Sequence, residues 1–310
     1  MSNNAMSQDL INNFKRNGFI TINSILSKEE LIILRNECET MLQMKPYAKM
    51  NNFSDFDYVY RMPVMEAKDR LVLENIIGIS PEVDRIMEKF FKNEQLKNVL
   101  NNTIGNNYKL WSCGIRLALA NSKQLGFHND SKGETGISIL LEDQFDPNGV
   151  TCVLPKSHLW PLSSQQTMIS ALPIKMFNKI YKPLVGKMGD TFIFFKKTLH
   201  GRMAGDSGKT GLIMLIALYS VGHTFRPFNE DKEVLYKLSE KHDELHRLIS
   251  HNDLEKINSA GVCKVLGEGE GNNFIDNLYK IKPSLLSPWH ITKLFKVLVI
   301  IFQKIKSLIK

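Results

Sequence analysis

The sequence predicts an α+β fold, mainly β, in which helices precede and follow a core of antiparallel strands. The first observation is a series of short apolar segments between about residues 105 and 225, separated by turn residues. The second is the helical spacing of apolar residues on both sides of that region. Short strands in series are typical of an antiparallel sandwich or barrel rather than of repeating βαβ units. We therefore expect a single domain, 1–310, with an N-terminal helical part at 6–104, a β core at about 105–225 and C-terminal helices at 228–291.

The N-terminal part is predicted to begin with a short helix at 11–16 and a short strand at 18–22. Ser27 and Glu30 have the spacing of a capping box, so a helix is expected to begin after Ser27. One face of that helix is apolar and carries Leu31, Leu34, Cys38, Met41 and Leu42. This spacing is typical of a helix with one buried face.

Further elements follow from the same patterns. Residues 45–80 mix aromatic residues, Asn and Asp without a clear period, and we expect loops there. A long helix is predicted over 82–100, with Val83, Ile86, Met87, Phe90 and Phe91 at helical spacing. Beyond the β core, residues 231–258 and 284–310 return to a helical pattern.

The β core is predicted to contain five strands, at 108–120, 136–141, 150–154, 191–195 and 211–221. Turn residues lie between them, at 146–149, at Gly186 and at Gly189-Asp190. The extended segments place alternate residues on opposite faces of a sheet.

Charge is distributed unevenly along the chain. Lys and Arg number 40 against 32 Asp and Glu, which gives a formal net charge of +8. Five of these charges lie in residues 292–310, which contain no acid, so the preceding residues are only weakly basic. We therefore expect no nucleic-acid partner.

The tail, 292–310, is predicted to be a basic amphipathic helix, with Ile, Leu, Val and Phe on one half and Lys on the other. Such a helix is typical of a peripheral contact with a membrane surface. The alternative is an ordinary amphipathic helix packed against the protein's own core or against a partner subunit.

The cysteine pattern and the first residues predict a cytoplasmic location. Cys38, Cys113, Cys152 and Cys263 form no CxxC pair, which indicates a reducing compartment rather than a disulfide scaffold or a zinc cluster. Residues 1–13 are polar and do not resemble a secretory signal. If the tail contacts a membrane, the expected location is the inner face of that membrane.

A candidate metal site lies in the β core. His128 and Asp130 are two residues apart in an extended segment, so both side chains point to the same face. His200 follows a distant strand and supplies a second imidazole. Two imidazoles and one carboxylate on one face suit non-haem Fe(II), because three positions stay open. The alternative for His128 is an ordinary hydrogen-bonded histidine.

The tripeptide His-Asn-Asp occurs twice, and its context distinguishes the copies. The second copy, 251–253, lies in a predicted helix, where residues two apart do not share a face. We interpret that copy as a solvated surface or a helix cap.

Four segments add a more specific pattern. Residues 149–158 read Gly-Val-Thr-Cys-Val-Leu-Pro-Lys-Ser-His, and residues 189–195 read Gly-Asp-Thr-Phe-Ile-Phe-Phe, followed by His200-Gly201. Residues 14–19 read Phe-Lys-Arg-Asn-Gly-Phe, and residues 26–30 read Leu-Ser-Lys-Glu-Glu. These resemble the G-x-L-x-V-x-P-G-S-H, G-D-x-x-x-F…H-G, F-x-x-x-G-[FY] and L-[ST]-x-[ED]-E segments of phytanoyl-CoA dioxygenase-like proteins. The resemblance covers about residues 11–222 in the family's order.

This resemblance implies a double-stranded β-helix (jelly-roll, cupin-like) core that binds Fe(II) and uses 2-oxoglutarate as cosubstrate together with O2. It also implies that His128, Asp130 and His200 are the iron ligands. The expected protein is then a dioxygenase that hydroxylates a C–H bond of a small-molecule or lipid-like substrate.

The family pattern departs at one position. The distal carboxylate of 2-oxoglutarate normally meets an arginine on the strand after the second histidine, where bidentate geometry favours arginine, and this chain has Gly211 there. Lys209 is the first replacement candidate, because it lies two residues earlier on the same strand face. Arg202 and Arg116 are the second and third. The alternative for all three is a solvated surface charge.

Other residues of interest have plainer interpretations. His158 is expected to fix the loop that contains it rather than to bind metal. Trp111 and Phe127 are candidates for lining a pocket, although packing is the commoner role of aromatic residues in a β core. Arg61 and Arg70 lie where a lid over the site would form. Cys113 and Cys152 are expected to be buried thiols.

The missing arginine motivates a second hypothesis, a non-catalytic metal-binding jelly-roll protein that has lost 2-oxoglutarate binding. A third is a cupin-like enzyme with one metal and no cosubstrate, for which Glu134 is the nearby candidate for an extra ligand.

Overall fold

A computed structural model of the chain describes the following residues: 3–43, 48–49, 65–67, 70–73, 76–120, 122, 125–129, 134–147, 149–160, 168–169, 181–205, 211–220, 224–225, 241–249, 254–257 and 263–265. The predicted helix at 284–310, including the basic tail at 292–310, lies outside them. Within the described residues, no helix has the length and apolar character needed to span a membrane.

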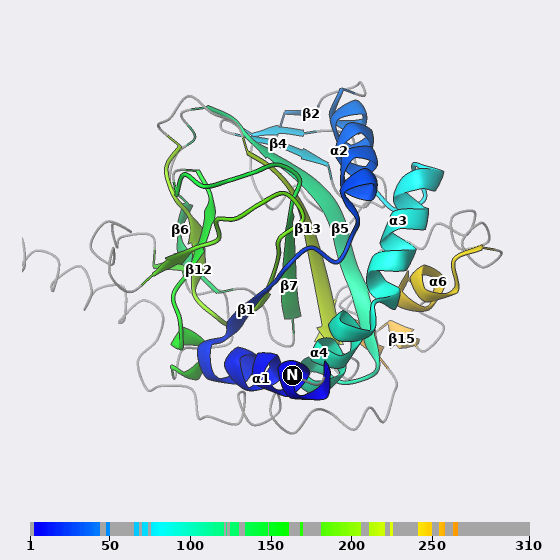
Figure 1. Ribbon diagram of the computed structural model, residues 1–310, viewed down its shortest axis with the longest axis vertical. Coiled ribbons are helices and arrows are strands. Elements are labelled where there is room, and N and C mark those ends of the chain that lie inside the picture. Colours follow the sequence, from blue (N-terminus) through cyan, green and yellow to red (C-terminus); the bar gives the residue numbers. More distant parts are fainter. Residues whose placement is uncertain are drawn as a thin grey trace, which may run out of the picture.

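Two sheets, antiparallel except for the parallel pair β2–β3, form the core of the described structure (Figure 1). The larger sheet has the strand order β1 (Phe19–Ile22), β11 (Thr191–Phe195), β7 (Glu134–Leu140), β13 (Gly211–Ser220), β5 (Tyr108–Ala118), β4 (Arg70–Leu73), β3 (Met65–Ala67) and β2 (Ala48–Lys49). The smaller sheet has the order β10 (Lys182–Pro183), β8 (Thr151–Val153), β12 (His200–Arg202), β6 (Leu125–His128) and β9 (Met168–Ile169). A third sheet contains β14 (Thr224–Phe225), β16 (Cys263–Val265) and β15 (Leu254–Ile257).

The chain crosses repeatedly between the two main sheets. Strands β5, β7, β11 and β13 belong to the larger sheet, and β6, β8, β10 and β12, which lie between them in the sequence, belong to the smaller one. This alternation is the connectivity of a double-stranded β-helix. The predicted fold class is therefore confirmed, with two open sheets rather than a closed barrel.

The two faces of the larger sheet differ, because one packs against the hydrophobic core and the other lines a cavity. In β13, Met214 and Leu218 belong to the main hydrophobic core, whereas Ile213 and Leu215 line a cavity on the other face. Such alternation follows from the pleat of a strand. Arg116 of β5, which pairs directly with Ile213, also faces the cavity. The cavity side of this sheet is the side turned toward the smaller sheet, because residues of both sheets line it.

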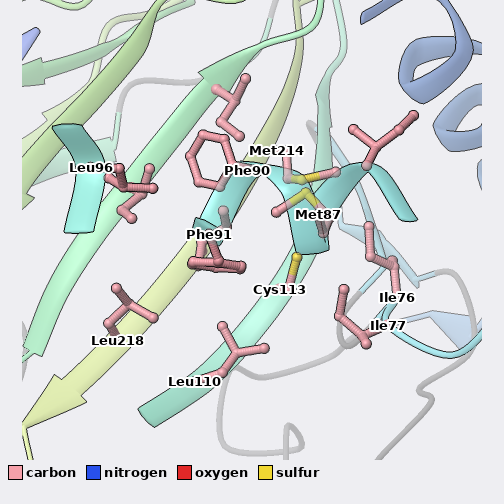
Figure 2. Close-up of a cluster of buried hydrophobic side chains, with 14 of the residues drawn as sticks. Ile76, Ile77, Met87, Phe90, Phe91, Leu96, Leu110, Cys113, Met214 and Leu218 are labelled. Carbon is pink, nitrogen blue, oxygen red and sulfur yellow. The ribbon is translucent and has the colours of Figure 1, made fainter. Parts of the chain in front are cut away.

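Helices cover the opposite face of the larger sheet (Figure 1). They are α1 (Asn3–Asn17), α2 (Lys28–Leu42), α3 (Pro81–Lys92) and α4 (Glu94–Ile104), with α6 (Asp243–Ile249) beside them. Figure 2 shows Met87, Phe90 and Phe91 of α3 packed near Cys113 and Met214 of the sheet. Burying one such side chain contributes roughly 1.5–3 kcal/mol, so this layer makes the sheet a firm support for the cavity.

Local capping explains where these helices begin. Ser27 and Glu30 form the predicted capping box, with Ser27 N–H donating to Glu30 Oε2 at 2.9 Å. The helix predicted at 82–100 is two helices, because Asn93 adopts an extended conformation between α3 and α4. Its side chain accepts a hydrogen bond from Leu96 N–H at 3.0 Å and caps α4.

Two further sequence predictions about secondary structure are wrong. The expected loops at 45–80 contain β2, β3 and β4, of which β4 pairs with β5 and extends the larger sheet. Strands of two to four residues are too short to show a period. The expected helix at 231–258 contains β15, and only α6 is helical among its described residues.

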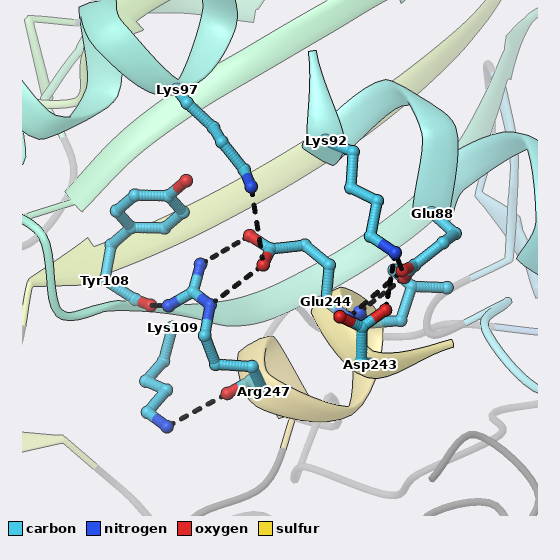
Figure 3. A network of polar contacts seen from close by, with 9 residues as sticks. Glu88, Lys92, Lys97, Tyr108, Lys109, Asp243, Glu244 and Arg247 are labelled. Carbon is cyan, nitrogen blue, oxygen red and sulfur yellow. Dashed lines mark hydrogen bonds and ion pairs between the residues drawn. The ribbon is translucent and has the colours of Figure 1, made fainter. Parts of the chain in front are cut away.

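A polar network attaches α6 to the N-terminal helices (Figure 3). Both oxygens of Glu88 accept backbone N–H groups of α6, from Glu244 at 3.1 Å and from Leu245 at 2.8 Å. Lys92 bridges Glu88 and Asp243. Arg247 donates to Glu244 at 2.7 Å and to the Tyr108 carbonyl at 3.3 Å. The network therefore ties α6 to α3 and to the start of β5.

Candidate active site

The two histidines that were predicted to bind metal meet in the smaller sheet. His128 is the last residue of β6 and His200 is the first residue of β12. The two residues are direct partners in the antiparallel register. Their ring centroids lie 4.4 Å apart with an angle of 51° between the rings. The fold therefore brings together two imidazoles that are distant in the sequence.

The backbone fixes the orientation of the His200 ring. Its Nδ1 lies 2.8 Å from the Thr198 carbonyl oxygen, which can only accept, so Nδ1 carries the proton. In the neutral imidazole the free lone pair then resides on Nε2, so Nε2 is the atom that can coordinate a metal. His200 is buried, and its ring centroid lies 5.1 Å from that of Phe194.

A glycine makes room for Phe194 beside the histidine. A Cβ at Gly136 of β7 would lie only 2.5 Å from the Phe194 ring. Gly136 is the direct partner of Phe194 in the sheet, so the ring lies across the glycine. A side chain at 136 would therefore push Phe194 away from its place against His200.

The third predicted ligand, Asp130, lies outside the described residues, which end at Asn129 before β7. Within the part of the chain that the structure describes, no group of three or more His, Cys, Asp or Glu side chains is arranged to hold a metal. The described residues thus provide the two imidazoles, and the carboxylate remains a prediction from the sequence.

A cavity of about 760 Å³ lies between the two sheets and includes both histidines in its wall. Its apolar wall is formed mainly by Leu140, Phe192, Phe194, Ile213 and Leu215. Its volume lies within the range of about 300–1,000 Å³ that is usual for sites that bind small molecules. The cavity is therefore large enough to accommodate a small molecule.

Of the three predicted cosubstrate residues, two line this cavity. Arg116 reaches it from β5 of the larger sheet, and Arg202 from β12 of the smaller sheet, two residues after His200. Lys209 lies outside the described residues. Lys196, which the sequence analysis did not single out, is a third cation in the wall. It belongs to the turn between β11 and β12. Lys196 and Lys197 are adjacent there, and the sequence does not indicate which of the two side chains faces the cavity.

Gly211 also lines the cavity, at the first position of β13. A Cβ there would lie 2.7 Å from Nε2 of Gln144. The Gln144 amide therefore occupies the position that a side chain at residue 211 would take. The neighbouring Leu212 N–H donates to Glu142 Oε1 at 2.9 Å. The loop after β7 therefore fills the space that the missing arginine side chain would enter, and the sequence analysis did not find Gln144.

Ser138 is a third cavity residue that was not predicted from the sequence. It lies on the cavity face of β7 between Gly136 and Leu140 and is 2% exposed. Its Oγ has no hydrogen-bond partner among the described residues. A buried hydroxyl without a partner is costly, so this group points to a ligand in the cavity. The signal in the sequence was the alternation of small residues, Gly136 and Ser138, among β-branched ones.

His158 lies away from the two facing histidines and fixes a turn, as predicted. It belongs to a 3-10 turn, Ser157–Leu159, and is completely buried. Its Nε2 donates to the Lys15 carbonyl at the end of α1, at 3.0 Å. Burial holds the pKa of its imidazole below the ordinary value, so the ring is neutral near pH 7.

The remaining predicted residues are less informative. Cys113 and Cys152 are buried thiols, as expected, and burial raises the pKa of Cys152 to about 12. Phe127 is buried in the interior. The side chains of Trp111, Arg70 and Glu134, and all of Arg61, lie outside the described residues, as does the second His-Asn-Asp tripeptide at 251–253.

Comparison with protein families identifies one match. The family model described as "Phytanoyl-CoA dioxygenase (PhyH)" matches residues 14–209, which is more than half of the chain. The match spans the segments on which the resemblance was based, and it confirms that resemblance. No curated protein matches the sequence.

Solved structures with the same fold include three whose descriptions name a bound metal, a cosubstrate or a biosynthetic pathway. The epimerase SnoN, in complex with Fe3+, alpha ketoglutarate and nogalamycin RO, aligns with a TM-score of 0.57 at 14% identity, covering 73% of this chain and 88% of that one. The carbocyclase SnoK from nogalamycin biosynthesis aligns with a TM-score of 0.54 at 15% identity, covering 73% and 89%. HygX from Streptomyces hygroscopicus, with nickel and 2-oxoglutarate bound, aligns with a TM-score of 0.51 at 12% identity, covering 69% and 87%.

Proposed function

Because the chain belongs to the phytanoyl-CoA dioxygenase family, we propose that it is a non-haem Fe(II)- and 2-oxoglutarate-dependent dioxygenase. Its reaction is the hydroxylation of a C–H bond in a small-molecule or lipid-like substrate. The observation that carries this proposal is the pair of facing imidazoles, His128 and His200, in the wall of a cavity of about 760 Å³.

The residues present fit an Fe(II) site. His128 and His200 are the proposed imidazole ligands, and Asp130 is the proposed carboxylate, two residues after His128. The proton on His200 Nδ1 leaves Nε2 as the coordinating atom. When bound, iron with 2-oxoglutarate and O2 supplies the oxidant for the C–H bond, and 2-oxoglutarate leaves as succinate and CO2. A carboxylate at 130, rather than a smaller residue, favours hydroxylation over halogenation.

Arg116 is the proposed anchor for the distal carboxylate of 2-oxoglutarate. It faces the cavity from β5 directly opposite Ile213, and Gly211 pairs with Ala118 one step further along. Arg116 is thus the diagonal neighbour of the position where the family has its arginine, and it lines the same cavity as Gly211. Arg202 and Lys209 remain the alternative anchors.

The chain's apolar side chains exclude water from the reaction. Phe192, Phe194, Ile213 and Leu215 line the cavity beside the histidines. A low-dielectric wall also strengthens the attraction between a carboxylate and an arginine. These residues therefore hold the cosubstrate in place and keep solvent from the substrate C–H bond.

Calorimetric titration of 2-oxoglutarate into Mn(II)-loaded protein under nitrogen tests this proposal. We expect binding to the unmodified protein, and succinate release when Fe(II) and O2 are supplied. Arg116→Met is expected to raise the Kd for 2-oxoglutarate about 10- to 100-fold, since a charge-assisted hydrogen bond contributes about 1.5–3 kcal/mol. Arg85→Met, on the exposed side of α3, is the matched control and is expected to leave the Kd unchanged.

A second candidate function follows from Gly211 and Gln144. Because Gln144 fills the place of the family's arginine, the alternative is a non-catalytic metal-binding jelly-roll protein that has lost 2-oxoglutarate binding. The same titration separates the two. Binding of Mn(II) without binding of 2-oxoglutarate at millimolar concentration would establish the second candidate and exclude the dioxygenase.

We further propose a cytoplasmic location with the 292–310 tail in peripheral contact with the inner face of a membrane. The lysines of the tail and its lack of acids support this proposal. The test of the membrane contact uses a peptide of these residues and anionic vesicles. If the peptide neither binds the vesicles nor becomes helical on them, the membrane contact is excluded.

A further inference from the structure

We propose that the hydroxyl groups of Ser157 and Thr198 are positioning groups for His200, through which they control metal affinity. This inference rests on the proposed function, in which His200 binds the metal. Both hydroxyls form hydrogen bonds with the backbone. Both hold the backbone turn between β11 and β12, and the last residues of that turn present the carbonyl that orients the ring.

Ser157 holds the turn from the side of β8. It is completely buried, and its Oγ accepts a hydrogen bond from Leu199 N–H at 2.8 Å. The same hydroxyl donates to the Leu154 carbonyl at 2.6 Å, and Leu154 N–H donates to the Leu199 carbonyl at 2.8 Å. Leu199 immediately precedes His200, so the residue before the proposed ligand is held on both its N–H and its carbonyl.

Thr198 holds the turn from the side of β1. Its Oγ1 donates to the Gly18 carbonyl at 3.0 Å, and Phe195 N–H donates to the same oxygen at 3.0 Å. Thr198 N–H closes the turn on the Phe195 carbonyl at 2.8 Å. The Thr198 carbonyl is therefore held in place, and it is this carbonyl that accepts the hydrogen bond from His200 Nδ1–H.

Gly18 is the point at which the supports meet. Its φ of +81° is in the region that favours glycine, and a Cβ there would lie 2.5 Å from Thr198 Oγ1 and 2.4 Å from His158 Nδ1. His158 and Lys156 in turn attach the 3-10 turn to the end of α1, through the carbonyls of Lys15 and Asn17. The start of the chain, the 3-10 turn and the β11–β12 turn thus form one rigid support for His200.

The support predicts a specific defect when it is weakened. Without the Ser157 hydroxyl, the buried Leu199 N–H loses its acceptor, and the turn must shift to reach another. Partners that orient a metal-binding histidine typically change metal affinity by about 10- to 100-fold when removed. A purely structural role would lower stability and leave metal affinity unchanged in the folded protein.

The test is titration with Co(II), followed by the visible absorption of the bound ion, in Ser157→Ala and Thr198→Val. Both variants are expected to bind Co(II) about 10- to 100-fold more weakly and to show altered absorption bands. Thr103→Val is the matched control, because Thr103 is equally buried and also donates to a backbone carbonyl, that of Val99 in α4. It is expected to lose stability and to keep Co(II) affinity within about twofold. Ser157→Thr keeps the hydroxyl and is expected to restore affinity.

Unchanged Co(II) affinity and spectrum in Thr198→Val and Ser157→Ala, with lowered stability, would overturn the inference. If Ser157→Ala does not fold, the comparison of Thr198→Val with Thr103→Val decides alone. If the unmodified protein binds no Co(II), the proposed function fails. If the unmodified protein and all variants bind Co(II) equally well, only the positioning role of Ser157 and Thr198 fails.

Discussion

At the scale of single residues, the cavity side of β7 combines small size with an unused hydrogen-bonding group. Gly136 makes room for Phe194, and Ser138 places a buried hydroxyl without a partner among the described residues in the cavity wall. Folding gains nothing from that hydroxyl, because it loses water and finds no acceptor or donor in return. We interpret it as a group kept for a ligand.

Ser138→Ala is therefore expected to stabilise the ligand-free protein by about 1 kcal/mol, because it removes an unsatisfied buried hydroxyl. The measurement is the free energy of unfolding in urea. Thr103→Val, which removes a satisfied hydroxyl, is expected to lose a similar amount. Lower stability of Ser138→Ala would show that the hydroxyl has a stabilising partner.

His158 predicts how stability responds to acid. Its folded-state pKa lies below the ordinary value of 6.5, and burial is the largest cause. As the pH falls through 6.5, the unfolded chain therefore binds a proton at this residue more readily than the folded protein does. The contribution of the neutral His158 side chain to the free energy of unfolding is therefore fully present above about pH 6.5 and is lost as the pH falls below that value. His158→Gln is expected to flatten the fall of the melting temperature between about pH 6.5 and 5. An equally steep fall in this variant would contradict the assignment.

At the scale of elements, the network around α6 shows how a short helix is held in place. Helix α6 has seven residues and is too short to be stable alone. Glu88 accepts two of its N–H groups, and Arg247 and Lys109 connect its last turn to β5. Its attachment therefore depends on side chains of distant elements.

Glu88→Ala is expected to release α6, because two buried N–H groups lose a charged acceptor worth roughly 1.5–3 kcal/mol. Hydrogen exchange of the amides of Glu244 and Leu245 is the measurement, and faster exchange there than in β13 is expected. Glu82→Ala, which removes only an exposed ion pair with Arg85, is the control and leaves that exchange unchanged. Equal protection of α6 in both variants would show that packing alone holds it.

The elements also show what the sequence could predict. The capping box at Ser27 and the long strands β5 and β13 were predicted, because their signals are local and span many residues. Helices α3 and α4 were predicted as one, because the cap made by Asn93 interrupts the chain without interrupting the apolar spacing. Strands β3 and β4 were missed, because pairing with neighbouring strands rather than a local pattern defines them: β4 pairs with β5, and β3 pairs with β4.

The site was predictable to the same degree. His128 and His200 were found from motifs and are direct partners in the sheet. Gln144 and Lys196 were missed, because a side chain becomes part of a wall only when distant strands are brought together. The supporting role of Ser157 depends on contacts with Leu154 and Leu199, and no periodicity reveals it.

At the scale of the whole molecule, a metal held by β6 and β12 should stabilise the entire fold. A ligand that binds only the folded state adds about 2.7 kcal/mol at one hundred times its Kd. Addition of Co(II) is therefore expected to raise the melting temperature, and His200→Ala should abolish the increase. His246→Ala, in α6, is the control and should keep it. An equal increase in His200→Ala would place the metal elsewhere.

The register that joins His128 to His200 has a consequence for the order of folding events. The two residues are 72 positions apart, and strands β7 to β11, which belong to both main sheets, lie between them in the sequence. Contacts between such distant segments form slowly, because the entropy of loop closure is lost before the pairing is gained. During refolding, the visible absorption of bound Co(II) should therefore appear after the circular dichroism signal of helices α2 to α4. The absorption then reports when β6 and β12 have paired.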